Sequence, residues 1–157
     1  MRKMLSSGLV VFAGVVSPIG VPSRQEPKAQ APEHRKDPRF EALRRFFERG
    51  DCPAKAYSHV FLEAADTYQL DWRLLPSISY IESTGGKAAP FNNMFGWDSG
   101  RAHFSSPSAG IHAVGYHLSH GSRYRRKNLD QLLATYNPDG EYAERVKSVM
   151  RQIALLP

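Results

Sequence analysis

The spacing of apolar residues constrains the fold of this 157-residue chain more than any other feature. From Asp37 to Ile153, apolar residues recur three and four positions apart, which is the period of an amphipathic α-helix. The pattern is interrupted once, for about twenty residues after Gly85-Gly86. We therefore expect a mostly α (α+β) domain of about six helices, with a small irregular or β-hairpin lobe around residues 91–104.

Turn and capping residues divide the helical pattern. Asp37 can cap the first helix, and Asn128, with a glutamine three positions later, resembles a capping box. Pro76 indicates that the third helix begins late or bends early. In the interruption, Asp98-Ser99-Gly100 is a turn sequence typical of a hairpin. The six helices are expected to begin near Asp37, Pro53, Asp71, Pro107, Asn128 and Tyr142.

The N-terminal segment has the composition of an export signal. Arg2 and Lys3 form a short positive end, and the apolar run from Leu5 to Val21 follows. A spanning helix needs about 20 apolar residues, and Pro18 interrupts this run. Residues 1–23 are therefore interpreted as a signal peptide, or as an N-terminal anchor if they stay uncleaved. We expect a periplasmic, cell-wall-associated or secreted protein, with membrane contact only through an uncleaved segment.

A tether separates this segment from the domain. Residues 24–36 contain Pro, Gln, Ala and charged residues without periodic apolar positions, which is typical of a flexible linker. One domain is expected to occupy residues 37–157, a length that suits a single hydrophobic core.

The net positive charge of the chain favours an anionic partner. Lys and Arg number 21 against 15 Asp and Glu, which gives a net charge of +6, or about +4 once Arg2 and Lys3 are removed. The densest basic run extends from Arg123 to Lys127. It is interpreted either as a contact with the anionic cell wall or lipid phosphate, or as a solvated loop. Export argues against a nucleic-acid partner.

Metal and cofactor chemistry has little support. The single cysteine, Cys52, excludes an internal disulfide and a zinc site with several thiolates. His117 and His120 have the spacing of metal ligands, but no carboxylate is placed to complete a site. We expect no metal and no cofactor.

Glu82 is the strongest candidate for chemistry. It shares a helix face with Leu75 and Ile78, and it lies at the C-terminal end of that helix. There the macrodipole disfavours a negative charge by about 0.3 to 1 kcal/mol. The apolar surroundings and the helix dipole both favour the protonated form of Glu82. A general acid must be protonated in order to give a proton to the leaving-group oxygen in glycosidic cleavage. The alternative is a glutamate at the helix rim that turns into solvent.

The residues after Glu82 suit a sugar site. Sugar rings present flat C–H faces and many hydroxyls, so their sites combine aromatic platforms with amides. Phe95 and Phe104 are expected in the core of the small lobe, whereas Trp97 and the two asparagines before it are harder to explain by packing. The candidates for substrate contact are Ser83, Asn92, Asn93, Trp97, Asp98, Tyr124, Tyr136 and Asn137.

Five short motifs follow one another along residues 55–150. They are Leu70 to Ile78, Glu82-Ser83, Asn92 to Trp97, Ala134 to Pro138, and Tyr142 to Val146. As an ordered set they resemble the lysozyme-like superfamily of bacterial enzymes that cleave cell-wall glycans. The Asn-Asn-x-Phe-Gly element resembles the glucosaminidase family, the mannosyl-glycoprotein endo-β-N-acetylglucosaminidase-like domain. The Glu-Ser and Tyr-Asn pairs also resemble the soluble lytic transglycosylases.

The resemblance implies roles for specific residues. Glu82 would be the catalytic acid, with Ser83 close by to orient it. Tyr136-Asn137 matches the family's Tyr-Asn pair, which lies in the cleft and contacts the sugar or the acid. Asn92-Asn93 would frame the other wall.

A shortage of carboxylates bears on the mechanism. Between Glu82 and Asp130 only Asp98 is acidic, and it is either a second catalytic group or a turn former. With Glu82 alone, the developing oxocarbenium ion is quenched by the substrate's N-acetyl oxygen, which leads to hydrolysis. Quenching by the C6 hydroxyl instead gives the anhydro product of a transglycosylase.

The sequence thus predicts an exported enzyme that cleaves β-1,4 bonds between N-acetylated amino sugars in the glycan strands of peptidoglycan. The alternative is a non-catalytic peptidoglycan-binding module of the same fold.

Overall fold

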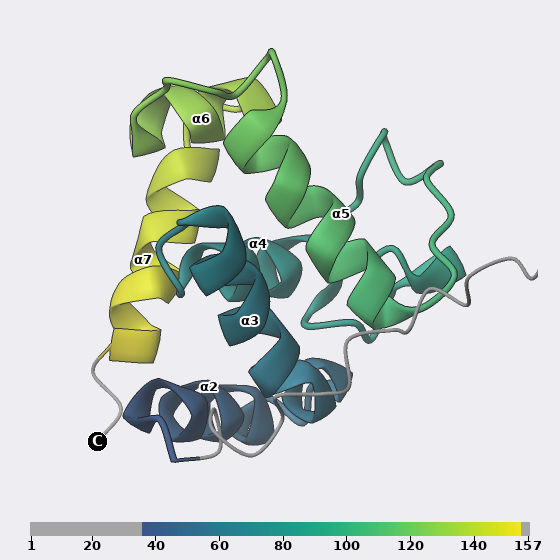
Figure 1. The fold of residues 1–157 in the computed structure, drawn as a ribbon, viewed down its shortest axis with the longest axis vertical. Helices are drawn as coiled ribbons and strands as arrows, with labels where there is room; N and C mark the ends of the chain where they lie inside the picture. Colours follow the sequence, from purple (N-terminus) through teal and green to yellow (C-terminus); the bar gives the residue numbers. More distant parts are fainter. Residues whose placement is uncertain (1–35, 155–157) are drawn as a thin grey trace, which may run out of the picture.

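A computed structural model describes residues 36–154 of the chain (Figure 1). The predicted export segment, and the predicted linker apart from Lys36, lie outside the described residues. Residues 36–154 are mostly helical, with six α-helices, two short 3-10 helices and no strand. The elements are α2 (Pro38–Arg49), η1 (Pro53–Tyr57), α3 (Ser58–Tyr68), α4 (Leu74–Ser83), η2 (Pro90–Asn92), α5 (Pro107–His120), α6 (Leu129–Tyr136) and α7 (Tyr142–Ala154).

Side-chain caps set where several helices begin. The Asp37 carboxylate accepts a hydrogen bond from the Arg39 amide at 2.8 Å at the start of α2. Asn128 and Gln131 form the predicted capping box at the start of α6. The late start of the third helix is also confirmed, because α4 begins at Leu74 and Pro76 falls in its first turn, where amides need no helical partner.

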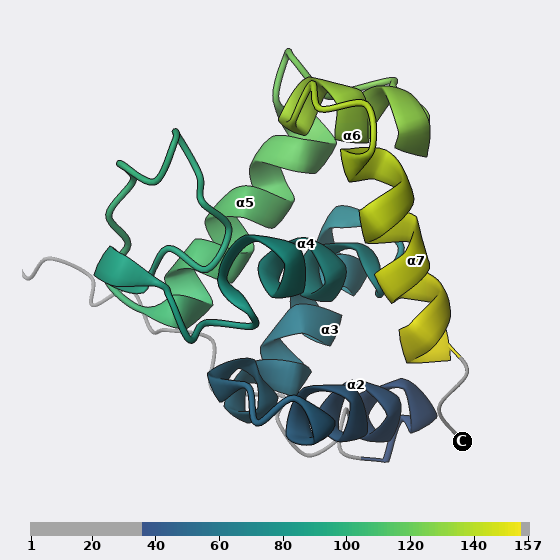
Figure 2. The same ribbon diagram turned by 180° about the vertical axis from the view of Figure 1, so that it is seen from behind.

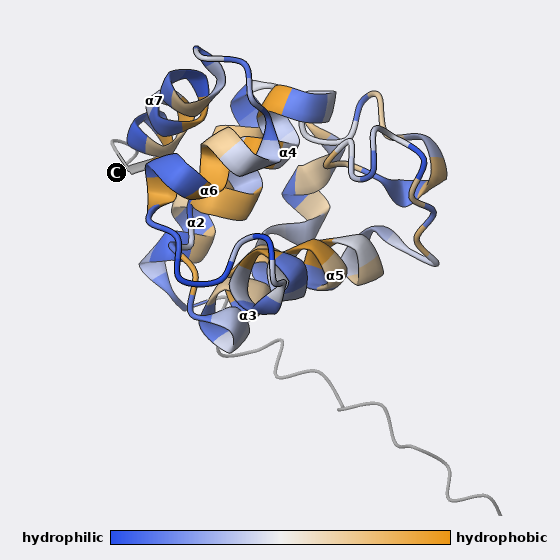
Figure 3. Cartoon of the chain, turned by 90° about the horizontal axis from the view of Figure 1, so that it is seen from above, coloured by the Kyte–Doolittle hydropathy of each residue, from blue (hydrophilic) through white to orange (hydrophobic). Residues whose placement is uncertain are grey.

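Helix α4 lies in the middle of the other helices (Figure 1, Figure 2). It packs against α3 and α7, and all of its residues from Leu74 to Ser79 are buried. Hydrophobic residues of α5 and α6 turn toward the middle of the molecule as well (Figure 3). The stretch of α4 from Leu74 to Ser79 is mainly apolar, with Ser77 and Ser79 as its polar residues, whereas Glu82 in the last turn is only half-buried. The last turn is therefore the part that can serve a site. Within residues 36–154, no helix is long and apolar enough to cross a membrane.

The end of α4 is tied to η1. The chain leaves the helix in a left-handed conformation at Thr84 and Gly85, whose φ angles are 54° and 60°. A Cβ atom at Gly85 would lie 2.8 Å from the Cβ of Cys52, so only glycine allows this contact. The Ala54 amide donates to the Gly85 carbonyl at 2.9 Å. These contacts fix the direction in which the next loop departs.

The β-hairpin predicted for residues 91–104 is not seen, and the prediction is corrected to a loop of turns that includes η2. The turn at Asp98-Ser99-Gly100 is present, with the Arg101 amide donating to the Asp98 carbonyl at 3.0 Å. A strand requires an extended backbone with negative φ. Phe91 and Asn92, at the start of the predicted hairpin, instead have φ angles of 57° and 58°.

Candidate active site

Glu82 lies in the last turn of α4, and the first residue of α7 holds its carboxylate. The Tyr142 hydroxyl donates a hydrogen bond to Oε1 of Glu82 at 2.7 Å. Tyr142 is only 1% exposed, whereas Glu82 is half-buried. One carboxylate oxygen is therefore held by a buried phenol, while the side chain as a whole keeps access to solvent.

The other oxygen faces the loop that follows α4. A Cβ atom at Gly96 would lie 2.8 Å from Oε2 of Glu82, a distance that real Cβ atoms essentially never show. Gly96 also has a φ of 59°, which side-chain-bearing residues seldom adopt. Glycine at this position therefore lets the backbone run directly past the carboxylate.

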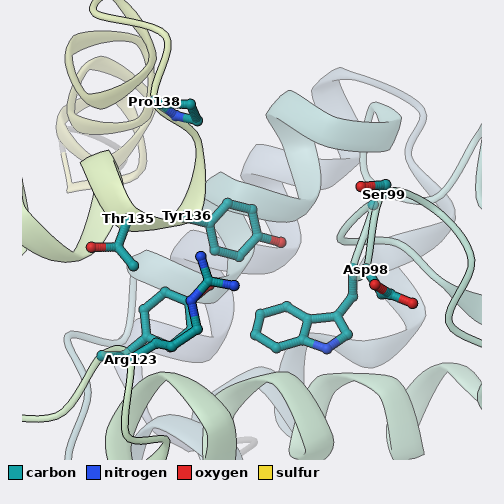
Figure 4. A pocket seen from close by; sticks show the side chains of 9 residues that line it. Asp98, Ser99, Arg123, Thr135, Tyr136 and Pro138 are labelled. Atoms are coloured by element: carbon teal, nitrogen blue, oxygen red, sulfur yellow. The ribbon is translucent and has the colours of Figure 1, made fainter.

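A pocket of about 430 Å³ lies beside Gly96 (Figure 4). It brings together the loop after α4, the connection between α5 and α6, and the end of α6. Aromatic side chains form one wall, with the Trp97 ring centroid 5.9 Å from that of Tyr124 and 5.8 Å from that of Tyr136. The pocket is lined by Gly96, Trp97, Asp98, Ser99, Arg123, Tyr124, Thr135, Tyr136 and Pro138.

Two tyrosines join the pocket to Glu82. The Tyr136 and Tyr142 rings are stacked, with centroids 5.9 Å apart and planes 8° apart. The Tyr136 hydroxyl donates to the Phe95 carbonyl at 2.5 Å. Burial, reinforced by the charge of nearby Glu82, raises the pKa of Tyr136 and the pKa of Tyr142 well above the ordinary value for tyrosine. Both phenols therefore stay neutral around pH 7 and act as hydrogen-bond donors.

The two asparagines at the end of η2, Asn92 and Asn93, stabilise the loop. Asn93 is 3% exposed, and its amide bonds to both main-chain groups of Trp97, accepting from the N–H at 2.9 Å and donating to the carbonyl at 3.0 Å. The Asn92 amide donates to the Phe104 carbonyl at 2.9 Å. Asn93 therefore holds Trp97 at the pocket wall, and Asn92 closes the base of the loop.

Ser83 is likewise engaged with the backbone. Its buried hydroxyl lies 2.8 Å from the Met94 carbonyl and accepts a hydrogen bond from the Gly86 amide at 3.0 Å. No hydrogen bond joins it to Glu82, which Tyr142 orients instead. Ser83 thus connects the end of α4 to the loop.

Asp98 and Asn137 lie near the edge of the pocket. The Asp98 side chain is 56% exposed, and its carboxylate pairs with Arg101 at 2.8 Å. Asn137 ends α6, where its side-chain oxygen accepts from the Asp139 amide at 3.0 Å. Its neighbours Tyr136 and Pro138, rather than Asn137 itself, line the pocket.

The structure therefore divides the predicted site residues into two groups. One group gathers at the pocket or directly behind it: Glu82, Trp97, Asp98, Tyr124 and Tyr136. The other group bonds to backbone that shapes the pocket: Ser83, Asn92, Asn93 and Asn137.

Tyr142 was not predicted as a site residue, because the sequence indicated it only as the start of the last helix and as part of a motif. One signal was available, because a tyrosine among Val146, Val149 and Ile153 brings a hydroxyl into a buried face. A buried phenol needs a hydrogen-bond partner, and that partner is Glu82. Gly96 was quoted as part of a motif, but its contact with Glu82 is visible only in the fold.

Among the described residues, no group of three or more His, Cys, Asp or Glu side chains could hold a metal ion. Comparison of the chain with protein-family models and with curated protein sequences finds no match.

Proposed function

We propose that this chain is a lysozyme-like enzyme that cleaves β-1,4 glycosidic bonds of peptidoglycan, with Glu82 as the general acid. One observation carries the proposal: the two oxygens of Glu82 have different surroundings. Oε1 accepts from the buried Tyr142 hydroxyl, whereas Oε2 lies beside Gly96, which lines the pocket. Glu82 itself is not among the pocket-lining residues, and Oε2 is next to the pocket through its contact with Gly96. This arrangement suits a general acid, which uses one oxygen for proton transfer while the other is held.

In the proposed reaction, Oε2 delivers a proton to the glycosidic oxygen of a sugar bound in the pocket. Glu82 is then a carboxylate, and the Tyr142 hydroxyl stabilises it by donating to Oε1. The same carboxylate takes the proton back in the second step, when it acts as the base. Because the Tyr142 phenol stays neutral, it supplies this hydrogen bond in both steps.

The pocket wall supports a sugar as the substrate. The rings of Tyr124 and Tyr136 each lie within 6 Å of the Trp97 ring, and sugar C–H faces pack on such aromatic surfaces.

The surroundings of Asp98 support a mechanism without a protein nucleophile. Its carboxylate is exposed and paired with Arg101 in a surface turn. The oxocarbenium ion is then quenched by the N-acetyl oxygen of an N-acetylglucosaminidase-type substrate, or by the C6 hydroxyl in a transglycosylase reaction. The first route requires the N-acetyl group of an amino sugar, the second requires a free C6 hydroxyl, and neither requires a cofactor.

The pairing of Asp98 with Arg101 also favours a second candidate, a peptidoglycan-binding module that does not cleave its ligand. If a second carboxylate is required, the pairing of Asp98 with Arg101 leaves the pocket able to bind glycan but unable to hydrolyse it. For either candidate the substrate lies outside the cytoplasm, so the proposal includes export through the N-terminal segment.

The decisive experiment compares the full chain with its Glu82→Gln variant on purified peptidoglycan. Wild type is expected to clear the substrate, and the variant to lose at least about 100-fold in rate, because general acids contribute 10²–10⁴-fold. Circular dichroism should show unchanged helicity in the variant. Mass spectrometry of the fragments then separates the routes, since anhydro ends indicate transglycosylation and reducing N-acetylglucosamine ends indicate the glucosaminidase.

Two results would count against the enzyme. A wild-type protein that pellets with peptidoglycan but releases no fragments is the binding module. A folded Glu82→Gln variant that retains more than about one hundredth of the rate removes Glu82 from the acid role.

A further inference from the structure

The connection between α5 and α6, residues 121–127, carries the densest positive charge of the chain; we call it the basic loop. Tyr124 anchors it, because this side chain is only 8% exposed and contacts Trp97. The amides of Tyr124 and Arg125 both donate to the Gly121 carbonyl at 2.9 Å. The basic loop is thus a structured element that borders the pocket.

The arginines of the basic loop differ from most others in residues 36–154. Of the eight arginines elsewhere in these residues, six lie within 3.0 Å of an Asp or Glu oxygen and two, Arg49 and Arg151, form no ion pair. The six are Arg39, Arg44, Arg45, Arg73, Arg101 and Arg145. By contrast, Arg123, Arg125 and Arg126 form no ion pair with any carboxylate of the described residues. The protein therefore supplies no counter-charge to the loop from these residues.

Of the three arginines, only Arg123 lines the pocket. Figure 4 shows its guanidinium group projecting into the space that Tyr136 and Thr135 also border. The remaining lining near it is aromatic or carries a hydroxyl, and Asp98 is already paired with Arg101. A planar guanidinium without a partner, set among neutral groups, is suited to bind a carboxylate through two parallel hydrogen bonds.

We propose that Arg123 binds a free carboxylate carried by the sugar itself, so that the pocket selects glycan strands whose lactyl carboxylates carry no peptide over neutral N-acetylated sugars. This inference rests on the proposed function and names the substrate class of the same pocket. Aromatic faces and hydroxyls bind neutral and acidic sugars alike, so a charged partner is what discriminates between them. Arg125 and Arg126 lie outside the pocket lining and raise the encounter rate with an anionic strand without selecting a sugar.

The test uses three oligosaccharides of equal length. The first alternates N-acetylglucosamine with N-acetylmuramic acid and has free lactyl carboxylates; in the second these carboxylates are converted to amides; the third is a neutral N-acetylglucosamine oligomer. Binding is measured by calorimetry with the full chain carrying Glu82→Gln, which prevents turnover, and cleavage is measured with the otherwise wild-type chain.

The acidic oligomer should bind about 10- to 100-fold more tightly than either neutral one, as expected for one charge-assisted contact. Arg123→Gln should remove this preference, and Arg123→Lys should restore part of it. Arg125→Gln is the matched control: it removes the same charge from the same loop outside the pocket, and the preference should persist. In cleavage assays, Arg123→Gln should raise KM for the acidic oligomer and leave kcat within about threefold.

Two outcomes overturn the inference, and they differ in what they say of the proposed function. If wild type cleaves all three oligomers with equal kcat/KM, or if Arg123→Gln and Arg125→Gln weaken binding equally, Arg123 is not selective and the proposed function stands. If no oligomer is bound or cleaved, the inference and the proposed function both fail.

Discussion

Glu82 depends on two neighbours that act on different oxygens, and each can be changed separately. The Tyr142 hydroxyl holds Oε1, and the missing side chain of Gly96 leaves room for Oε2.

Replacing Tyr142 with phenylalanine tests the first contact. Tyr142→Phe keeps the buried ring but removes the donor to Glu82, so kcat should fall about 10- to 100-fold. The free energy of unfolding should fall by only about 1 kcal/mol, the usual net value of one hydrogen bond. Steady-state kinetics and urea unfolding measure the two effects. Tyr116→Phe, which removes a hydroxyl exposed on α5, should change neither, and a Tyr142→Phe enzyme with normal kcat would refute the role assigned to this hydroxyl.

The glycines of the loop offer a closely matched pair for the second contact. Gly96→Ala and Gly100→Ala each place a side chain at positive φ, at 59° and 81°, which costs about 1 to 2 kcal/mol of stability. Only the methyl group at position 96 meets Glu82, because nothing lies within 4 Å of a Cβ atom at position 100. We therefore expect similar losses of stability but a further loss of about 100-fold in kcat/KM for Gly96→Ala alone. Equal kcat/KM values for the two variants would show that a methyl group beside Oε2 of Glu82 does not affect catalysis.

At the scale of elements, the helices follow from the sequence and the loop between α4 and α5 does not. Apolar periodicity and capping residues predict helices because both act within a few residues of the chain. The loop was predicted to be a hairpin because its turn residues permit one. Its conformation is instead set by contacts across the chain, such as the bond from Tyr136 to the Phe95 carbonyl. Local patterns carry no information about such a partner, 41 positions away.

Asn93 is the internal support of this loop. Asn93→Ala removes both hydrogen bonds to the Trp97 main chain in a buried setting, so the free energy of unfolding should fall by about 2 to 3 kcal/mol. Tryptophan fluorescence should also change, because Trp97 loses its fixed place against Tyr124 and Tyr136. Asn128→Ala, which removes the exposed cap of α6, should cost about 1 kcal/mol and leave the fluorescence nearly unchanged. If Asn93→Ala is as stable as wild type, the loop has another support.

At the scale of the whole molecule, two buried phenols make stability depend on alkaline pH. The pKa of Tyr136 and the pKa of Tyr142 are raised by burial in the folded state, while in the unfolded chain tyrosine ionises near pH 10. The unfolded state therefore releases protons above about pH 10 while these phenols stay neutral in the folded state. Their contribution to stability is complete below pH 10 and declines above it, by up to about 1.4 kcal/mol per pH unit for each phenol.

Urea unfolding between pH 8 and pH 11 measures this decline. Tyr142→Phe and Tyr136→Phe should each make the slope above pH 10 shallower, whereas Tyr116→Phe serves as the exposed control. Equal slopes in all of these proteins would mean that the two phenols do not remain neutral in the folded state.

The sequence by itself determined the six helices, the caps of α2 and α6, the apolar character of α4 and the candidacy of Glu82, because each depends on residues close together in the chain. Only the tertiary structure decided which side chains meet Glu82 and the pocket. Tyr142 lies 60 positions from Glu82, and Arg123 lines the pocket whereas Arg125, two positions later, does not. The packing of distant elements places the Tyr142 hydroxyl beside Glu82 and leaves Arg123 without a carboxylate partner in the described residues. No local spacing encodes that outcome.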